Sequence, residues 1–299
     1  MRTVYLGTSP FAVAVLERLA ESDHRPLLVV TRPDRPRGRG RKVSPPPAAE
    51  AARRLGIEVY QPDTVNSDAA LERIASLEPD AVCIAAFGAL IKEPLLSAYP
   101  MYNVHPSLLP RWRGAAPIER AIEAGDRETG VSIMRPTAAM DAGPVCLQAG
   151  EPILGDDDYG TLSARLEGLS GELLVRALDE QPPFVEQPAE GVTIADKVGP
   201  DDRRLDPRES ADVLERRVRA LTPHVGAFVE LPGGERLGVR RAAISDPHVA
   251  PDPGDLVVSD GHLLWGCAAG ALELLTVQPP GGRPMEAAAY LRGHAGRLA

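Results

Sequence analysis

The 299-residue sequence has few of the features that would tie it to a membrane, a metal ion or an oxidising compartment. Its only cysteines, Cys83, Cys146 and Cys267, are odd in number, far apart and flanked by apolar residues, which indicates reduced thiols in a core. The six histidines include no pair at the spacing of metal ligands, so we expect no metal site. No segment approaches the length of an apolar membrane span, and no membrane association is expected.

The N-terminus lacks the features of a secretory signal. Residues 1–6 run directly into Gly7, with neither a long apolar region nor a small-residue cleavage site. This segment is therefore expected to form a first strand, and the cytoplasm is the expected compartment. Aromatic residues make up only 4% of the chain, which leaves Ala, Val and Leu to fill the core.

Acidic side chains outnumber basic ones, 42 to 33, but one short segment is strongly basic. The formal net charge of −9 argues against a general attraction to nucleic acid. Residues 32–42, however, carry six basic side chains and a single acidic one, Asp34. A cationic loop on an acidic protein is a candidate phosphate contact, with a solvated surface loop as the alternative.

The N-terminal half alternates between two kinds of apolar pattern. The predicted strands are residues 3–6, 27–30, 58–60 and 81–85, and the predicted helices are residues 11–20, 48–55 and 69–77. Residues 32–47 show no periodicity and are rich in Gly and Pro, which predicts a loop. Strands separated by helices predict an α/β fold with a Rossmann-like, mostly parallel sheet and helices on both faces.

The length of the chain predicts two domains. A strand at residues 145–148 and a long helix at 161–178 are followed by a proline-rich polar stretch, which is the best linker candidate. Beyond it, a helix at 211–221 precedes short strands separated by Pro and Gly turns, and this pattern predicts a small β-barrel. The expected divisions are a catalytic domain over 1–183, a linker over 184–203 and a C-terminal domain over 204–299.

Polar side chains close an apolar strand near the middle of the chain. Asn103 and His105 lie two residues apart in an extended segment, so their side chains leave the same face, and Pro106 ends the strand. Asp141 follows in a loop of small residues between two apolar runs. An amide that donates to an oxyanion, an imidazole that exchanges a proton and a carboxylate that orients the ring suit acyl transfer. For each residue taken singly, a structural role in a strand end or turn is the alternative.

The motifs around these residues resemble those of the folate-dependent formyltransferases, and most closely the methionyl-tRNA branch of that family. The similarity covers nearly the whole chain and includes Gly7–Phe11 near the N-terminus and the Pro-Asp-Arg-Pro, Gly-Arg-Gly loop within residues 31–42. The motifs nearest the polar site are Asn103–His105, Ser107–Ile118, Gly130–Met134 and Met140–Gly143.

The resemblance implies formyl transfer from 10-formyltetrahydrofolate, used as a co-substrate, to the amino group of initiator methionyl-tRNA. It implies three catalytic residues, Asn103, His105 and Asp141. The implied folate-binding residues are Phe87, Gly88, Leu90, Ser107, Leu108, Leu109 and Pro110. The implied tRNA-binding residues are Arg35, Arg37, Arg39, Arg41 and Lys42.

For the C-terminal domain the resemblance implies an OB-like barrel that binds tRNA. No obligate protein partner is evident from the sequence. Residues 204–207 and 222–225 lack the aromatic side chains that the family commonly has there, so the sequence gives no support to a stacking contact with tRNA at these positions.

Other functions share part of this pattern. A nicotinamide-dependent oxidoreductase would share the opening strand, glycine turn and helix, but Gly7–Ala12 lacks the second and third glycines of the dinucleotide fingerprint. A formyl-folate hydrolase, in which water replaces the amine, would use the same three catalytic residues. So would a nucleotide-sugar amine formyltransferase. A non-enzymatic RNA-binding protein would have no need of them.

Overall fold

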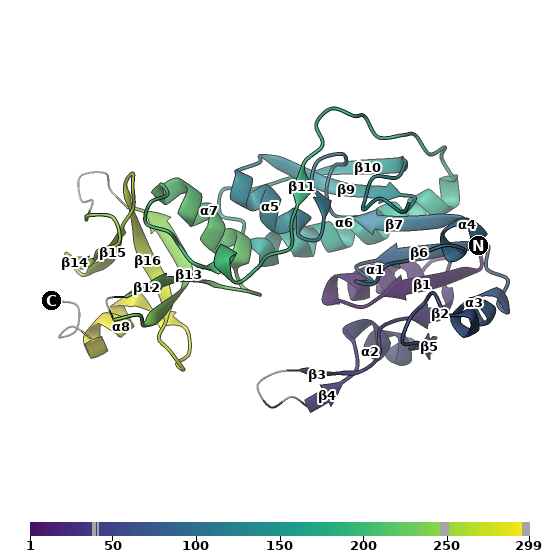
Figure 1. The fold of residues 1–299 in the computed structure, drawn as a ribbon, viewed down its shortest axis with the longest axis horizontal. Helices are drawn as coiled ribbons and strands as arrows, with labels where there is room; N and C mark the ends of the chain where they lie inside the picture. The colour runs from purple at the N-terminus through teal and green to yellow at the C-terminus, as the bar shows by residue number, and fades with distance from the viewer. Residues whose placement is uncertain (38–39, 41, 232, 246–250, 295–299) are drawn as a thin grey trace. The chain divides into compact units, whose positions relative to one another are not determined.

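The computed structural model describes residues 1–37, 40, 42–231, 233–245 and 251–294, and its packing divides into two compact units (Figure 1). The first unit comprises residues 1–114, 129–152 and 163–194. The second comprises residues 115–128, 153–162 and the chain from 195 onward. The second unit therefore draws on three separate stretches of the sequence.

The first unit is built on a seven-stranded sheet in the order β10-β9-β7-β6-β1-β2-β5. Its strands are β1 (Thr3–Gly7), β2 (Pro26–Val30), β5 (Glu58–Tyr60), β6 (Ala81–Ala85), β7 (Met101–His105), β9 (Glu128–Met134) and β10 (Val145–Pro152). The pairs β5–β2, β2–β1, β1–β6 and β6–β7 are parallel, whereas β7 and β9 are antiparallel. The expectation of a mostly parallel sheet is confirmed.

The helices that pack with this sheet are α1 (Pro10–Ala20), α2 (Pro47–Arg54), α3 (Asp68–Ala75), α4 (Leu95–Ala98) and most of α6 (Tyr159–Glu180). Ser9 caps α1 by accepting from the Ala12 N–H, and Ser67 caps α3 by accepting from the Ala70 N–H. Such caps satisfy backbone donors that a helix leaves free at its N-terminus. They help to explain why these two helices begin where they do.

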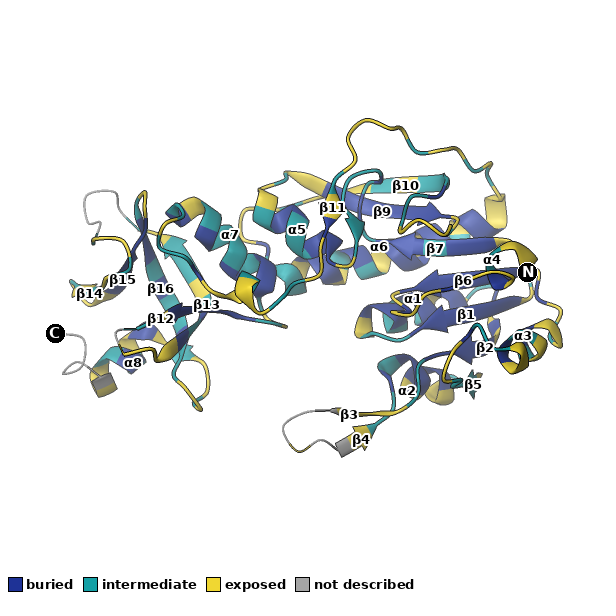
Figure 2. Ribbon diagram, in the orientation of Figure 1, coloured by how far each residue is buried: buried dark blue, intermediate teal, exposed yellow. Residues whose placement is uncertain are grey.

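Alternate residues of β1 face opposite sides of the sheet. The Tyr5 hydroxyl donates to the Ala12 carbonyl of α1 at 2.6 Å. Val4 and Leu6 instead belong to the buried cluster that contains Ile74 of α3 and Leu95 of α4. Helices therefore cover both faces, as the sequence predicted, and the central strands are buried (Figure 2).

The prediction of a plain loop over residues 32–47 was wrong, because a two-stranded hairpin lies within it. Its strands are β3 (Arg35–Arg37) and β4 (Lys42–Ser44), and Arg35 pairs with Ser44. Arg35 and Pro36 are exposed, and Val43 is 59% exposed. A hairpin held by backbone hydrogen bonds that buries neither face produces no hydrophobic alternation for sequence analysis to detect.

The second unit contains helices α5 (Pro117–Ala124), α7 (Ala211–Leu221) and α8 (Ala287–His294), and the short 3-10 turn η1 (Asp201–Arg203). Its six-stranded sheet comprises β12 (Ala227–Glu230), β13 (Arg236–Ile244), β14 (Leu256–Ser259), β15 (His262–Gly266), β16 (Ala271–Gln278) and β17 (Met285–Glu286). Every pairing in this sheet is antiparallel. The sheet packs with α7 around Trp265, which is 2% exposed.

Two short strands complete the secondary structure. They are β8 (Arg113–Gly114), which follows the predicted catalytic strand β7, and β11 (Ile194–Ala195), where the chain passes from the first unit to the second. Among the described residues, no helix is both long enough and apolar enough to cross a membrane.

Candidate active site

Asn103 lies on β7, between a parallel neighbour, β6, and an antiparallel one, β9. It pairs with Met134 of β9, and its side-chain Nδ2 donates to the Met134 sulfur at 3.3 Å. A thioether is a weak acceptor, so this contact holds the amide without using up its capacity to donate. A stronger acceptor, such as an oxyanion, would compete successfully for the same N–H group.

His105 ends the same strand with only 5% of its side chain exposed. The ring Nε2 lies 2.8 Å from the Trp112 carbonyl oxygen, and because a carbonyl can only accept, Nε2 carries the hydrogen. The other ring nitrogen, Nδ1, lies 3.7 Å from Asp141 Oδ2. A neutral ring in this position would turn the Nδ1 lone pair toward the carboxylate. Nδ1 is therefore the ring nitrogen that faces the carboxylate.

Asp141 occupies a loop with a left-handed backbone, at φ 48°. Its Oδ2 accepts from the Gly114 N–H at 2.9 Å. Two residues later, a Cβ at Gly143 would lie 1.9 Å from the Arg135 carbonyl oxygen, so only glycine fits there. The loop backbone is also held from outside, because Gln187 Nε2 donates to the carbonyls of Asp141 and Gly143 at 2.8 and 2.7 Å.

The structure therefore brings His105 and Asp141 together and places Asn103 two residues before His105 on the same strand. The groups that hold the pair in place were not predicted from the sequence. Two of these groups are backbone atoms, the Trp112 carbonyl and the Gly114 N–H, which have no signature in residue type. The third is Gln187, which falls within the stretch expected to be a linker.

The predicted folate-binding residues after β6 differ in exposure. Phe87 is 5% exposed, and its carbonyl accepts from the Thr8 hydroxyl at 2.7 Å. Gly88 has a positive φ of 70°. Leu90 is 61% exposed, and so is Met140, at 70%, in the loop that carries Asp141. Large exposed apolar side chains on two loops suit a flat ligand with apolar faces.

The predicted folate-binding residues after β7 form a tight and largely internal turn. Ser107 is buried, and its hydroxyl donates to the Arg111 carbonyl at 2.6 Å. Leu109 is 5% exposed, and its N–H donates to the Ser132 hydroxyl at 3.0 Å. Leu108 and Pro110 are partly exposed and are the residues of this turn with side-chain surface open to a ligand.

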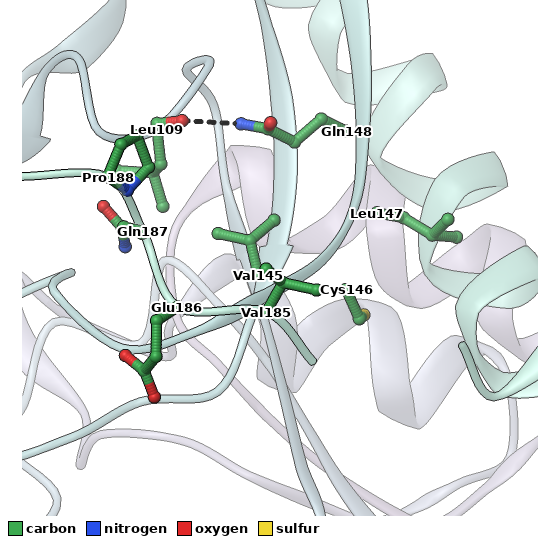
Figure 3. A pocket seen from close by; sticks show the side chains of 9 residues that line it. All are labelled: Leu109, Val145, Cys146, Leu147, Gln148, Val185, Glu186, Gln187 and Pro188. Carbon is green, nitrogen blue, oxygen red and sulfur yellow. Dashed lines mark hydrogen bonds between the residues drawn. The ribbon is translucent and has the colours of Figure 1, made fainter. Parts of the chain in front are cut away.

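A pocket of about 250 Å³ lies at the edge of β10, where the chain after α6 runs beside that strand (Figure 3). Val145 and Val185 exchange two backbone hydrogen bonds there, at 2.8 and 2.9 Å. Gln148 Nε2 donates to the Leu109 carbonyl at 2.9 Å. Leu109 is the one predicted folate-binding residue that lines the pocket, and the other lining residues are Val145–Gln148 and Val185–Pro188.

The thiol that lines this pocket is not activated. Burial raises the pKa of Cys146 to about 11, so it stays protonated at neutral pH. All three cysteines are free, as predicted. Within the ranges that the structure describes, no group of three or more His, Cys, Asp and Glu side chains is placed to hold a metal ion.

The cationic loop is described only in part. Arg35 is exposed on β3. For Arg37 and Lys42 the structure describes the backbone of the hairpin alone. Arg39 and Arg41 lie outside the described residues.

The sequence matches two known families. Residues 1–178 match the family described as Formyl transferase, and residues 197–295 match the family described as Formyl transferase, C-terminal domain. A protein named methionyl-tRNA formyltransferase from Methylococcus capsulatus is 41% identical over 302 aligned positions, which cover 99% of this chain and 97% of that protein.

Solved structures of low sequence identity share the fold. An N-formyltransferase from Helicobacter canadensis, in complex with folinic acid and dTDP-3-aminofucose, aligns with a TM-score of 0.68 at 13% identity over 92% of this chain and 99% of that one. Methionyl-tRNA formyltransferase from Clostridium thermocellum aligns with a TM-score of 0.58 at 14% identity over 82% of this chain and 94% of that one. The family matches and the 41% identical relative, which both span nearly all of the sequence, show that the chain belongs to the formyl transferase family.

Proposed function

We propose that the protein transfers the formyl group of 10-formyltetrahydrofolate to the free amino group of initiator methionyl-tRNA, in the cytoplasm, for the start of translation. The observation that carries this proposal is the His105–Asp141 pair, at 3.7 Å, on the strand that also bears Asn103. The agreement in name among relatives at 39–42% identity over nearly the whole chain supports the choice of acceptor.

The reaction makes three demands on the protein. The amine attacks the formyl carbon, the formyl oxygen gains negative charge in the tetrahedral state, and the folate nitrogen leaves with a proton. In the proposed mechanism the Asn103 amide donates to the developing oxyanion, in place of its weak contact with Met134. The hydrogen bond lost to the thioether costs little compared with the one gained.

His105 supplies the proton to the leaving nitrogen. Its Nε2–H is already engaged by the Trp112 carbonyl, so Nδ1 is the nitrogen that exchanges a proton. Asp141 Oδ2, at 3.7 Å from Nδ1, orients the ring for this transfer. The proton lost by the attacking amine leaves through water, with Asp141 as a second acceptor.

The two remaining alternatives differ in the acceptor. A formyl-folate hydrolase would use water. A nucleotide-sugar enzyme would use a small amine, such as the dTDP-3-aminofucose in the structure of the Helicobacter canadensis enzyme. The cationic hairpin favours tRNA as the acceptor. Six basic side chains on a protein of net charge −9 can contact the many phosphates of an RNA, whereas a small amino sugar offers too few negative groups to engage them. In this proposal Arg35, Arg37, Arg39, Arg41 and Lys42 contact the RNA.

We further propose that the catalytic and folate-binding groups lie in residues 1–183, that residues 184–203 lead from them to the C-terminal domain, and that residues 204–299 contribute tRNA binding. In the catalytic part, folate would contact Leu90, Leu108 and Pro110, which are exposed or partly exposed. Phe87, Gly88, Ser107 and Leu109 would shape the wall behind them.

One experiment separates the three functions. The protein is incubated with 10-formyltetrahydrofolate and, in separate reactions, with charged initiator tRNA, with free methionine, with a nucleotide-linked amino sugar or with buffer alone. We expect formyl transfer to the charged tRNA at a rate far above formate release in buffer. Equal formate release with and without tRNA would support the hydrolase instead, and transfer to the sugar alone would support the third function.

A further inference from the structure

The chain that follows α6 returns to the predicted catalytic residues. Residues 184–193, which we call the strap, lie in the first unit. At its start, Phe184 packs against Tyr102 with ring centroids 5.6 Å apart, and the Arg135 guanidinium lies 4.5 Å from the Phe184 ring centroid. Val185 then forms the antiparallel bridge to Val145 on β10. These contacts fix the first part of the strap to the sheet.

The end of the strap holds the segment that orients His105. The Trp112 N–H donates to the Thr193 hydroxyl oxygen at 2.8 Å. The Arg113 N–H donates to the Thr193 carbonyl at 3.0 Å. The strap therefore binds the N–H of Trp112, and the carbonyl of the same residue accepts from His105 Nε2.

Gln187, midway along the strap, connects both sides of the catalytic pair. Its Nε2 donates to the carbonyls of Asp141 and Gly143, and its Oε1 accepts from Arg113 Nε at 3.0 Å. Both hydrogens of the amide and its oxygen are thus in use. One side chain ties the Asp141 loop to the strand β8 segment, whose Gly114 N–H in turn binds the Asp141 carboxylate.

The backbone at Asp141 needs such support. A non-glycine residue at φ 48° adopts a conformation that is uncommon for L-residues and persists only where its surroundings hold it. Two hydrogen bonds from Gln187, one at Asp141 itself and one two residues beyond, hold the loop on both sides of this position. They fix where Oδ2 lies relative to His105 Nδ1.

We propose that Gln187 is a positioning residue for formyl transfer, which sets the Asp141 carboxylate against His105 without touching a substrate. The inference rests on the proposed function for its kinetic consequence but not for its structural one. A displacement of a catalytic group by about 1 Å can lower turnover by about 10²-fold. The loss of both hydrogen bonds is therefore expected to act mainly on kcat.

The test compares Gln187→Glu with Gln187→Met and a matched control. Glu keeps the shape and the contact with Arg113 but replaces the two N–H donors by an oxygen that two carbonyls repel. Met keeps the length and has no donor, and it serves if the Glu variant fails to fold. Glu190→Gln is the control. Residue 190 is exposed on the same strap, and the change replaces a carboxylate by an amide, the reverse of Gln187→Glu.

With charged initiator tRNA and saturating 10-formyltetrahydrofolate, we expect kcat to fall by about 10- to 100-fold in both Gln187 variants and KM for tRNA to change by less than about threefold. The control should match the unmodified protein. A kcat within twofold of the control for both variants would overturn the inference. So would a fall in kcat accompanied by an equal loss of folate binding and of thermal stability, which would indicate a merely structural role.

A second measurement is independent of activity. The 15N chemical shifts of the His105 imidazole report on the contacts of Nδ1 and Nε2. We expect the Nδ1 shift to change in the Gln187 variants and to stay the same in Glu190→Gln. If the unmodified protein formylated no acceptor, the proposed function would fail while this measurement still decided the role of Gln187. If the unmodified protein is active but the His105 15N shifts are unchanged in the Gln187 variants, the positioning role of Gln187 is excluded and the proposed function stands.

Discussion

His105 donates from Nε2 to the backbone carbonyl of Trp112 at 2.8 Å, and it therefore meets Asp141 with its other nitrogen, at 3.7 Å. A carbonyl oxygen cannot change its protonation state, so it fixes which ring nitrogen is committed to structure. Nδ1 is left for proton exchange beside a carboxylate. This difference between the two ring nitrogens underlies the first prediction.

Removing the imidazole should abolish most of the transfer. We expect His105→Ala to lower kcat by about 10²- to 10⁴-fold, as for a lost general acid, and folate binding to survive. The measurement is single-turnover formylation of charged initiator tRNA together with a direct folate titration. Near-normal turnover at saturating substrates would mean that His105 is not the acid.

Removing the amide should have a smaller effect. We expect Asn103→Ala to lower kcat by about 10²- to 10³-fold, the range for the loss of one oxyanion donor. Asn103→Asp, which has almost the same shape, should be at least as harmful because a carboxylate repels the developing charge. Steady-state kinetics on the two variants tests this role, and an Asp variant as active as the unmodified protein would exclude it.

The thiol chemistry follows from the direction of the pKa shift. Only the thiolate reacts with alkylating agents, and burial raises the pKa of Cys146 to about 11, so the reactive fraction is small at pH 8 and grows about tenfold per pH unit toward that value. Cys83, whose pKa burial raises to about 12, should react still more slowly. Peptide mass spectrometry after iodoacetamide treatment at pH 7, 8 and 9 gives both rates. Rapid labelling of Cys146 at pH 7 would contradict the prediction.

The second unit offers a test of stability. Arg217 of α7 bonds Glu123 at 2.7 Å and Glu209 at 2.6 Å, and only 16% of its side chain is exposed. Arg217→Met leaves Glu209 without its cation, whereas Glu123 keeps its ion pair with Arg120 at 2.6 Å. We expect the change to lower the free energy of unfolding by about 2 kcal/mol, less than for a fully buried pair. Urea unfolding provides the measurement.

Arg176→Met is the matched control for this stability test. Its ion pair with Glu180 joins side chains that are 59% and 50% exposed, and solvent screens such a pair. The expected loss of stability is therefore much smaller than for Arg217→Met. If the two variants lost equal stability, burial would not be what makes the Arg217 contacts matter.

The parts of the fold that the sequence predicted are those that bury apolar side chains. The strand at 81–85, which is buried throughout, and the helix at 211–221 have the bounds that were predicted from apolar pattern alone. The hairpin of β3 and β4 was missed because it buries neither face. Hydrophobic pattern reports burial, and structure made by backbone pairing alone leaves no such trace.

The groups of the candidate site likewise differ in whether they leave a trace in the sequence. Asn103, His105 and Asp141 were found because their chemistry is specific to their side chains. The Trp112 carbonyl and the Gly114 N–H were not, since every residue but proline has both groups. Gln187 was missed because its neighbours include several prolines and polar residues, a composition typical of a linker. A segment without periodicity can still be held firmly by side-chain bonds to backbone carbonyls.

The cationic loop decides between a tRNA and a small amine as acceptor, and Arg39 is its most informative residue. Glycines at 38 and 40 flank it, which lets the backbone approach RNA closely while the guanidinium forks toward a base or a phosphate. Arg39 lies outside the described residues, so its role rests on the sequence and on the exposed hairpin strands beside it. If the proposed function holds, we expect Arg39→Ala to lower kcat/KM for charged initiator tRNA by more than tenfold, because it removes the guanidinium that would meet the RNA. Arg35→Ala, in the exposed part of the hairpin, should lower kcat/KM by less and should reduce the salt slope of tRNA binding by about one if Arg35 meets a single phosphate.

Kinetics at two salt concentrations with both variants, beside the unmodified protein, makes the comparison. A specificity constant unchanged by Arg39→Ala at both concentrations would favour a small amine as the acceptor.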